Sequence, residues 1–302
     1  MSASPTPSGP AAPSASSPSP AFRTAYERAL ALWPVPVEPV ACQGEFGTTR
    51  VNACGAVGRP PLVLLGGGGP TSAGWYARVA ELARTHRVHA VDVPGTPGLT
   101  VPAGRPLRRP ADLMAWLDGL LDGLGLDRVA LMGHSYGGWI AAGYAVHAPD
   151  RVERLVLLDP TQVFAGYRVS YLVRAVPLLV RPGEAGARRL LAWECGDGPG
   201  VAPELVRLMG KGEREFRGVR PVTGARPELA RLAAAGASVL VLVAGESRAH
   251  DARKVVAAAG RALPGARVVT VPGVGHHALP ELRSAEMDGE LSGFLTDGAE
   301  SG

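Results

Sequence analysis

The stretch that decides the fold is "RVALMGHSYGGWIAAGYA", Arg128–Ala145. It begins with a short, continuous apolar run and ends in an apolar, alanine-rich segment, so a buried strand is predicted to run into a helix. Between them, Gly133–Gly137 fits the pattern G-x-S-x-G. The chain has 40 glycines, so the pattern alone carries little weight. Its place between a strand and a helix is what exposes a serine on a sharp turn at a sheet edge.

A serine on such a turn is suited to be a nucleophile. The backbone there is strained, and glycines on either side of the serine avoid a collision. The N-terminus of the following helix favours negative charge that develops near the hydroxyl. We therefore predict that Ser135 is a nucleophile. The alternative is a glycine-lined turn in a binding protein that has the shape without the chemistry.

Strand and helix patterns alternate on both sides of this turn. The strand candidates are continuous apolar runs, which a sheet buried on both faces requires. Their alternation with helices predicts a mostly parallel central sheet flanked by helices, an α/β fold with right-handed crossovers. The strands are expected within 60–69, 87–95, 127–133, 151–159, 237–245 and 266–273, with weaker candidates at 38–44 and 48–55, and the helices within 21–33, 74–86, 111–125, 137–149, 251–263 and up to residue 295.

The alternation breaks between residues 161 and 226. Two segments there, 163–180 and 187–194, have a helical pattern, and no strand is indicated. Because the strands resume afterwards, we predict a helical cap at 161–226, inserted before the last two strands and lying over the sheet edge where ligands bind. The core that carries the sheet then comprises 21–160 and 227–302. Residues 1–20, rich in Ser, Pro and Ala, are predicted to be a disordered tail.

Composition argues against several classes of protein. The net charge is only +4, without a block of like charges, so no nucleic-acid partner is expected. The N-terminal segment lacks the basic start and apolar run of a secretory signal, and no stretch of about 18 apolar residues predicts membrane insertion. The three cysteines lack metal-ligand spacing. We expect no metal, reduced cysteines and a cytoplasmic location.

Four segments together resemble the α/β-hydrolase family, and the resemblance spans roughly residues 22–295. They are "GHSYGG" at 133–138, "LLGGGG" at 64–69, "DVPGTPGLT" at 92–100 and "PGVGHH" at 272–277. Each is unspecific alone, but the set is specific. The resemblance implies the hydrolase fold, serine chemistry and a cap, as in capped serine esterases and lipases.

A serine needs a base to become a good nucleophile. In the family that the chain resembles, this base is a histidine in a Gly-His pair after the last strand. His276 has that placement, and exchange of roles with its neighbour His277 is the main alternative. His134 lies inside the turn and is expected to pack beneath it. The run "GVGHHA" also mimics a dinucleotide motif, but too little chain follows for a strand–helix–strand unit, so no cofactor is expected.

The oxyanion of an acyl-transfer reaction needs two backbone donors. One is expected from Tyr136, the residue after the nucleophile. The other is expected from the glycine loop, where the family usually has His-Gly and this chain has Gly66-Gly67. Gly68 is then the second donor, because the missing histidine affects packing and not the main chain. The alternative for this loop is a simple glycine hinge.

The acid that orients the histidine is the hardest residue to assign. The family usually places it in the turn after the strand at 237–245, but the usual offset falls on Ser247 or Arg248. Asp159, at the end of the strand at 151–159, is our first candidate, since some hydrolases supply the acid from that earlier strand. Its alternative role is an Asp-Pro turn at the entry to the cap.

Two further carboxylates are candidates for the same role. Asp251 is the second candidate, although it can instead cap the following helix, and Glu246 is the third because it comes early in the turn. Whichever carboxylate serves, its task is to hold the imidazole in one orientation and to stabilise the charged form.

These residues predict a serine hydrolase that cleaves a small or medium acyl ester through an acyl-enzyme. Thioester or lactone cleavage, perhydrolysis and hydroxynitrile cleavage remain open, because a fold does not fix the chemistry. A non-catalytic small-molecule binder on the same scaffold is the alternative of another class. The sequence does not reveal the oligomeric state.

Overall fold

A computed structural model describes residues 18–219 and 221–297, and the tail predicted at 1–20 therefore lies largely outside the described residues. One nine-stranded sheet forms the centre of the described part. Its strands are β1 (Glu38–Gly44), β2 (Gly47–Cys54), β3 (Pro61–Leu65), β4 (Arg87–Val91), β5 (Val101–Pro102), β6 (Val129–His134), β7 (Val152–Leu158), β8 (Ser238–Ala244) and β9 (Arg267–Val271).

The strand order is β1-β2-β4-β3-β6-β7-β8-β9, with β5 paired to β2. β1 and β2 form an antiparallel hairpin, and β2 also runs antiparallel to β4. All pairs from β4 through β3, β6, β7 and β8 to β9 are parallel. The prediction of a mostly parallel sheet is confirmed, and β6, which precedes the serine turn, lies at its centre.

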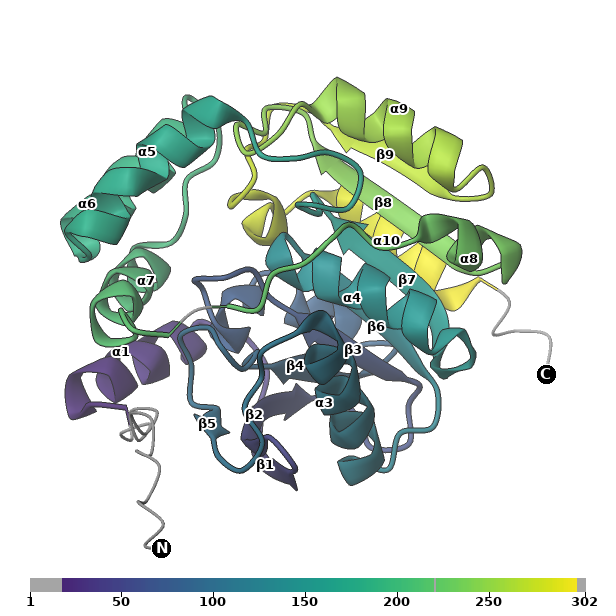
Figure 1. Cartoon of the computed structure of the whole chain (residues 1–302), viewed down its shortest axis with the longest axis horizontal. Coiled ribbons are helices and arrows are strands. Elements are labelled where there is room, and N and C mark those ends of the chain that lie inside the picture. Colours follow the sequence, from purple (N-terminus) through teal and green to yellow (C-terminus); the bar gives the residue numbers. More distant parts are fainter. Residues whose placement is uncertain (1–17, 220, 298–302) are drawn as a thin grey trace, which may run out of the picture.

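Helices and 3₁₀ turns connect the strands. They are α1 (Pro20–Leu30), η1 (Ser72–Trp75), α2 (Val79–Leu82), α3 (Pro110–Gly123), α4 (Tyr136–His147), η2 (Pro149–Arg151), α5 (Val169–Val180), α6 (Glu184–Cys195), α7 (Pro203–Glu215), α8 (Leu229–Ala234), α9 (Ala252–Ala262), η3 (Leu279–Glu281) and α10 (Ala285–Thr296). α3, α4, α8 and α9 cover one face of the sheet, and α2 and α10 cover the other (Figure 1).

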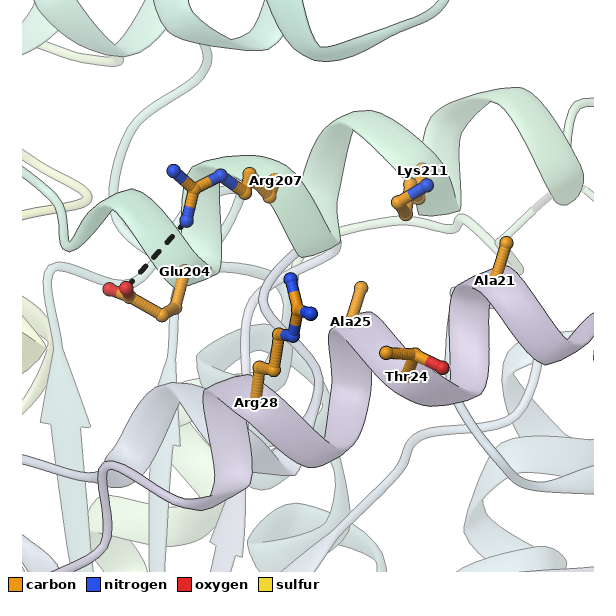
Figure 2. Close-up of a pocket in the computed structure, with 7 residues that line it drawn as sticks. All are labelled: Ala21, Thr24, Ala25, Arg28, Glu204, Arg207 and Lys211. Carbon is orange, nitrogen blue, oxygen red and sulfur yellow. Dashed lines mark ion pairs between the residues drawn. The ribbon is translucent and has the colours of Figure 1, made fainter.

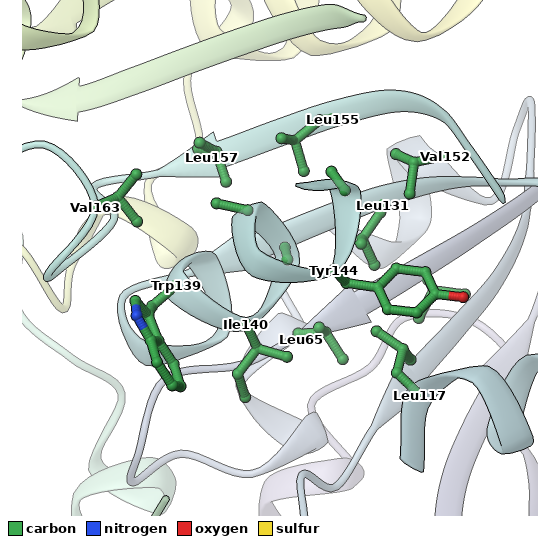
Figure 3. Packing of buried hydrophobic residues seen from close by; sticks show 14 of the residues in the cluster. Leu65, Leu117, Leu131, Trp139, Ile140, Tyr144, Val152, Leu155, Leu157 and Val163 are labelled. Atoms are coloured by element: carbon green, nitrogen blue, oxygen red, sulfur yellow. The ribbon is translucent and has the colours of Figure 1, made fainter. Parts of the chain in front are cut away.

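Both faces of the sheet are apolar because side chains alternate along each strand. On β6, Leu131 packs into the core shared with α3 and α4, whereas Met132 packs into the core shared with α10. Figure 3 shows Ile140 and Tyr144 of α4 lying against the sheet near Leu65 and Leu131. Burial on both faces explains why the strands read as continuous apolar runs.

The helix predicted over 74–86 is wrong in its extent. The structure has only η1 and the four-residue α2 in this region. The guanidinium group of Arg78, 1% exposed, donates to the Asp288 carboxylate and to the Leu282 carbonyl, and the Arg78 N–H bonds to the Trp75 carbonyl at 2.9 Å. This i to i−3 bond and the buried contacts of Arg78 override the local helical pattern.

Four helices, α5 to α8, lie between β7 and β8, and α5, α6 and α7 form an arc beside the sheet (Figure 1). The sequence pattern indicates α5 and α6 but not α7 or α8. Gly210 and Gly212 weaken the helical propensity of α7, and its buried Leu205 and Leu208 pack against α1. α7 is therefore stabilised by tertiary packing.

Candidate active site

The backbone at Ser135 turns sharply between β6 and α4. Ser135 has φ +55° and ψ −117°, a conformation that a non-glycine residue rarely adopts. A Cβ at Gly133 would lie 2.3 Å from the Gly137 carbonyl oxygen, and one at Gly137 would lie 2.1 Å from the Leu65 carbonyl oxygen. Any side chain at either position would collide with main chain, so the turn requires both glycines. The serine thus sits at the N-terminus of α4.

The structure brings Ser135, His276 and Asp159 together at the carboxyl ends of the parallel strands. The His276 Nε2 lies 2.8 Å from the Ser135 Oγ, and the His276 Nδ1 lies 2.6 Å from the Asp159 Oδ2. A neutral imidazole with its proton on Nδ1 satisfies both contacts, donating to the carboxylate and accepting from the hydroxyl. Ser135 is 7% exposed, while His276 and Asp159 are 1% and 0% exposed. The serine is the member of this trio that solvent reaches.

Asp159 accepts four hydrogen bonds. Oδ1 takes the Ala244 N–H at 3.0 Å and the His250 Nε2 at 2.8 Å. Oδ2 takes the Ser247 hydroxyl at 2.8 Å besides the His276 ring. Burial raises the pKa of Asp159, but the hydrogen bonds from His250 and His276 outweigh it and place that pKa far below its usual range. The carboxylate is therefore ionised at neutral pH.

The two other candidate acids lie elsewhere. The Asp251 carboxylate caps α9 by accepting the Lys254 N–H at 3.2 Å, and it lies 3.5 Å from the Arg168 guanidinium. This is the helix-capping role that the sequence left open. Glu246 is exposed, and its N–H donates to the Val274 carbonyl at 3.0 Å. Neither residue is brought to the imidazole.

Sequence reasoning missed Ser247 and His250 as site residues. Both belong to the turn after β8, where the acid was first sought. The sequence did contain one signal for them: Ser247 occupies the position after the strand at 237–245 where the family usually has the acid. In this chain the turn supplies donors to the carboxylate of Asp159, which directly follows β7.

The neighbouring histidines have other partners. His134 is buried beneath the turn, with its Nε2 3.0 Å from the His276 carbonyl oxygen, and burial followed by the nearby imidazoles lowers its pKa well below the usual value. His277 pairs through Nδ1 with the Glu194 carboxylate of α6. Burial opposes the charged form of His277, but Glu194 outweighs it and raises the pKa. His277 thus faces Glu194, and His276 faces Ser135.

The glycine loop after β3 contacts the serine. A Cβ at Gly67 would lie 3.3 Å from the Ser135 Cβ, so the loop passes directly over the nucleophile position. Gly68, the expected donor, is exposed, with no atom within 4 Å of where its Cβ would be. Tyr136 is the first residue of α4, and the first N–H groups of a helix have no intrahelical partner.

The inserted helices reach the site at several points. The Glu194 carboxylate of α6 accepts the His277 N–H at 3.2 Å. The Met209 Cε of α7 would lie 2.8 Å from a Cβ on Gly69 of the loop. The Tyr136 hydroxyl donates to the Val222 carbonyl at 2.7 Å, in the chain that follows α7. These contacts place parts of the segment between β7 and β8 against residues that flank the serine turn.

A surface hollow of about 250 Å³ lies away from these residues, between α1 and α7 (Figure 2). Its walls carry Arg28, Arg207 and Lys211, with Glu204 paired to Arg207 at 3.7 Å. It shares no residue with the serine–histidine–aspartate cluster. It is a feature of the contact between the N-terminal helix and the inserted helices.

Within residues 18–219 and 221–297, no group of three or more His, Cys, Asp or Glu side chains is placed to hold a metal ion. The helices of the described part are too short or too polar to cross a bilayer. The three cysteines are buried and free.

Residues 62–288 match the family model described as "Alpha/beta hydrolase family". The chain is 32% identical over 209 residues to the carboxylesterase YbfK of Bacillus subtilis, covering 68% of this chain and 69% of that protein. The crystal structure of that carboxylesterase superposes with a TM-score of 0.84 at 28% identity, over 92% of this chain and 98% of the other. An uncharacterized carboxylesterase, nap, of the same bacterium is 30% identical over 60% of this chain and 59% of its own length.

Proposed function

Because the chain belongs to the alpha/beta hydrolase family, we propose that it is a carboxylesterase that cleaves small or medium acyl esters through Ser135, His276 and Asp159. The observation that carries the proposal is the placement of one imidazole between the serine oxygen, at 2.8 Å, and a buried carboxylate, at 2.6 Å. The similarity to YbfK, a carboxylesterase, supports the ester as substrate.

In the acylation step, the Ser135 Oγ attacks the ester carbonyl carbon and its proton passes to the His276 Nε2. The tetrahedral intermediate then collapses. The bond to the alcohol breaks, and the alcohol oxygen takes the proton from Nε2. Asp159 holds the Nδ1–H and stabilises the imidazolium while it exists. The product of this step is an acyl ester on Ser135.

In the deacylation step, water replaces the alcohol. The His276 Nε2 takes a proton from water, whose oxygen attacks the acyl carbon, and the proton returns to the Ser135 oxygen when the acid leaves. The enzyme is thereby restored without any cofactor. A binder has no need for an imidazole that both contacts a serine hydroxyl and rests on a carboxylate.

The oxyanion of both tetrahedral intermediates is assigned to the backbone N–H groups of Gly68 and Tyr136. Two observations support this: the glycine loop packs on the Ser135 Cβ, and Tyr136 begins α4. Donors that belong to the main chain are fixed before the reaction, which makes them effective at stabilising charge that develops in the transition state.

The helices within 161–226 are proposed to act as a cap that limits the size of the acyl group. Contacts of α6 with His277 and of α7 with the glycine loop support this role. The core then comprises 21–160 and 227–302. The free, buried state of all three cysteines fits a reducing compartment such as the cytoplasm.

The test is hydrolysis of a chain-length series of nitrophenyl esters by the parent and by Ser135→Ala. We expect a maximum at short or medium acyl chains and a loss of kcat on the order of 10⁵-fold in the variant. Ser238→Ala, at the exposed first residue of β8, is the control and retains parent activity. A Ser135→Ala variant as active as the parent would reject the proposal.

A further inference from the structure

A second imidazole lies on the carboxylate of Asp159. The His250 Nε2 is 2.8 Å from Oδ1, on the oxygen that His276 does not use. His250 is 1% exposed and lies in the turn between β8 and α9. The two rings stand nearly perpendicular, at 78°, with their centroids 6.1 Å apart. Asp159 is thus held between two histidines, one of which contacts the nucleophile.

The donors are divided evenly between the two carboxylate oxygens. Each oxygen receives one imidazole, and each receives one more donor, the Ala244 N–H on Oδ1 and the Ser247 hydroxyl on Oδ2. This arrangement fixes the plane of the carboxylate. The backbone of Asp159 is strained, with φ +39°, so these hydrogen bonds hold the side chain of a residue in an unfavourable conformation.

The other nitrogen of His250 has no partner among the described residues. Its Nδ1 is buried without a hydrogen bond. Leaving a buried polar atom unpaired costs about 1–3 kcal/mol, so an apolar side chain would fill this space more favourably if packing were the only requirement. The contact with Asp159 is therefore the feature that accounts for a histidine here.

We propose that His250 is a positioning residue for ester hydrolysis. It donates its Nε2–H to Asp159 and thereby holds the other carboxylate oxygen toward His276. It acts through the aspartate and does not touch the substrate. The inference rests on the proposed roles of Ser135, His276 and Asp159.

Other ionisable groups also lie near the pair formed by Asp159 and His250. Besides His276, the charge of Asp159 reaches the His134 and His277 rings, although burial has the largest effect on the pKa of each. The buried Tyr171 hydroxyl of α5 is near enough for Asp159 to contribute to the rise of its pKa, after the larger effect of burial. Of the charged neighbours of His250 in the chain, Arg248 lies over the Trp193 ring, and Asp251 caps α9. Asp159 is therefore the charged group in direct contact with the His250 ring.

The sign of the effect on the pH profile follows from the hydrogen bond. A donor on the carboxylate withdraws negative charge from it. Without that donor, Asp159 stabilises the protonated form of its other imidazole more strongly, so the base stays protonated to higher pH. The acidic limb of the kcat/KM profile then moves to higher pH.

The experiment compares His250→Gln and His250→Leu with the parent on one nitrophenyl ester across pH. The glutamine amide can place an N–H near the position of Nε2, whereas leucine cannot. We expect a roughly 10- to 100-fold lower kcat with unchanged KM in the leucine variant, with the acidic limb displaced to higher pH. We expect the glutamine variant to lie within about threefold of the parent, with the limb in place. His86→Gln, another buried histidine, is the control.

Two results would overturn the proposal: a leucine variant with the parent's kcat and pH profile, or a glutamine variant as impaired as the leucine variant. Thermal unfolding verifies that each variant is folded. If leucine prevents folding, His250→Asn replaces it with the same expectations, since its shorter amide does not reach Oδ1. Failure of the proposed function is distinct, because the parent itself would then not hydrolyse the ester.

Discussion

Replacing Asp159 with asparagine removes one charge at nearly constant shape. In the parent, the Asp159 carboxylate accepts four hydrogen bonds, two on each oxygen. An amide keeps one accepting oxygen, and its NH₂ group must face two of the present donors. The least costly adjustment is for His276 to move its proton from Nδ1 to Nε2, so that Nδ1 accepts from the amide. Nε2 then carries a proton and cannot take one from Ser135.

The expected loss follows from this change of tautomer. In serine hydrolases of this kind, an aspartate-to-asparagine change lowers kcat about 10⁴-fold while the geometry is kept. At 1.36 kcal/mol for each factor of ten, that is about 5.4 kcal/mol of transition-state stabilisation. KM changes little, because Asp159 is fully buried and the substrate does not reach it.

The assay is steady-state hydrolysis of a nitrophenyl ester, with circular dichroism to verify the fold. Asp251→Asn is the matched control, because Asp251 is the competing acid and its contacts are with α9 and Arg168. Its kcat should stay within about twofold of the parent. A folded Asp159→Asn variant that retains a tenth or more of the parent's kcat would refute the reasoning, as would a large loss in Asp251→Asn.

Three other changes have definite outcomes. Gly137→Ala places a Cβ 2.1 Å from the Leu65 carbonyl oxygen and should lower the free energy of unfolding by about 3 kcal/mol or more, measured in urea. Burial raises the pKa of Glu281 from 4.5 to about 7, so folding takes up a proton between these values and stability falls as pH rises through that window. The melting temperature of Glu281→Gln relative to that of the parent should therefore rise as the pH increases from about 5 to about 8. Melting temperatures that depend on pH in the same way in both proteins would contradict this. Glu194→Gln removes the buried partner of His277 and should cost about 3 kcal/mol in the same urea assay, whereas an unchanged midpoint would show that the pair does not stabilise the fold.

Much of the fold could be predicted because the sequence features that determine it extend over only a few neighbouring residues. A sheet buried on both faces requires continuous apolar strands, and the runs around Leu131 and Leu240 have that character. The turn at Ser135 requires small neighbours within a few residues, so it is also visible in the sequence. The prediction of a helix over 74–86 was wrong in extent because the Arg78 side chain donates hydrogen bonds to Leu282 and Asp288. These partners are about 200 residues away in the sequence, so no local pattern reveals them.

Only some of the site residues can be assigned from the sequence around them. His276 follows the last strand closely, so its place could be predicted, and Asp159 could be ranked first among three carboxylates. Three of the four bonds on that carboxylate depend on β7 and β8 being neighbouring strands, because their donors are Ala244 at the end of β8 and Ser247 and His250 in the turn after it. The partner of His277 comes from the inserted helix α6, across a long separation in sequence. Spacing alone cannot predict such contacts.

The central claim is that the hydroxyl of Ser135 is activated in the folded chain. Reaction with a fluorophosphonate followed by peptide mass mapping tests it most directly. The account predicts one label per chain, on the peptide that contains Ser135, in the folded parent and not after heat denaturation. A folded parent that remains unlabelled, or that carries the label on another serine, would contradict it.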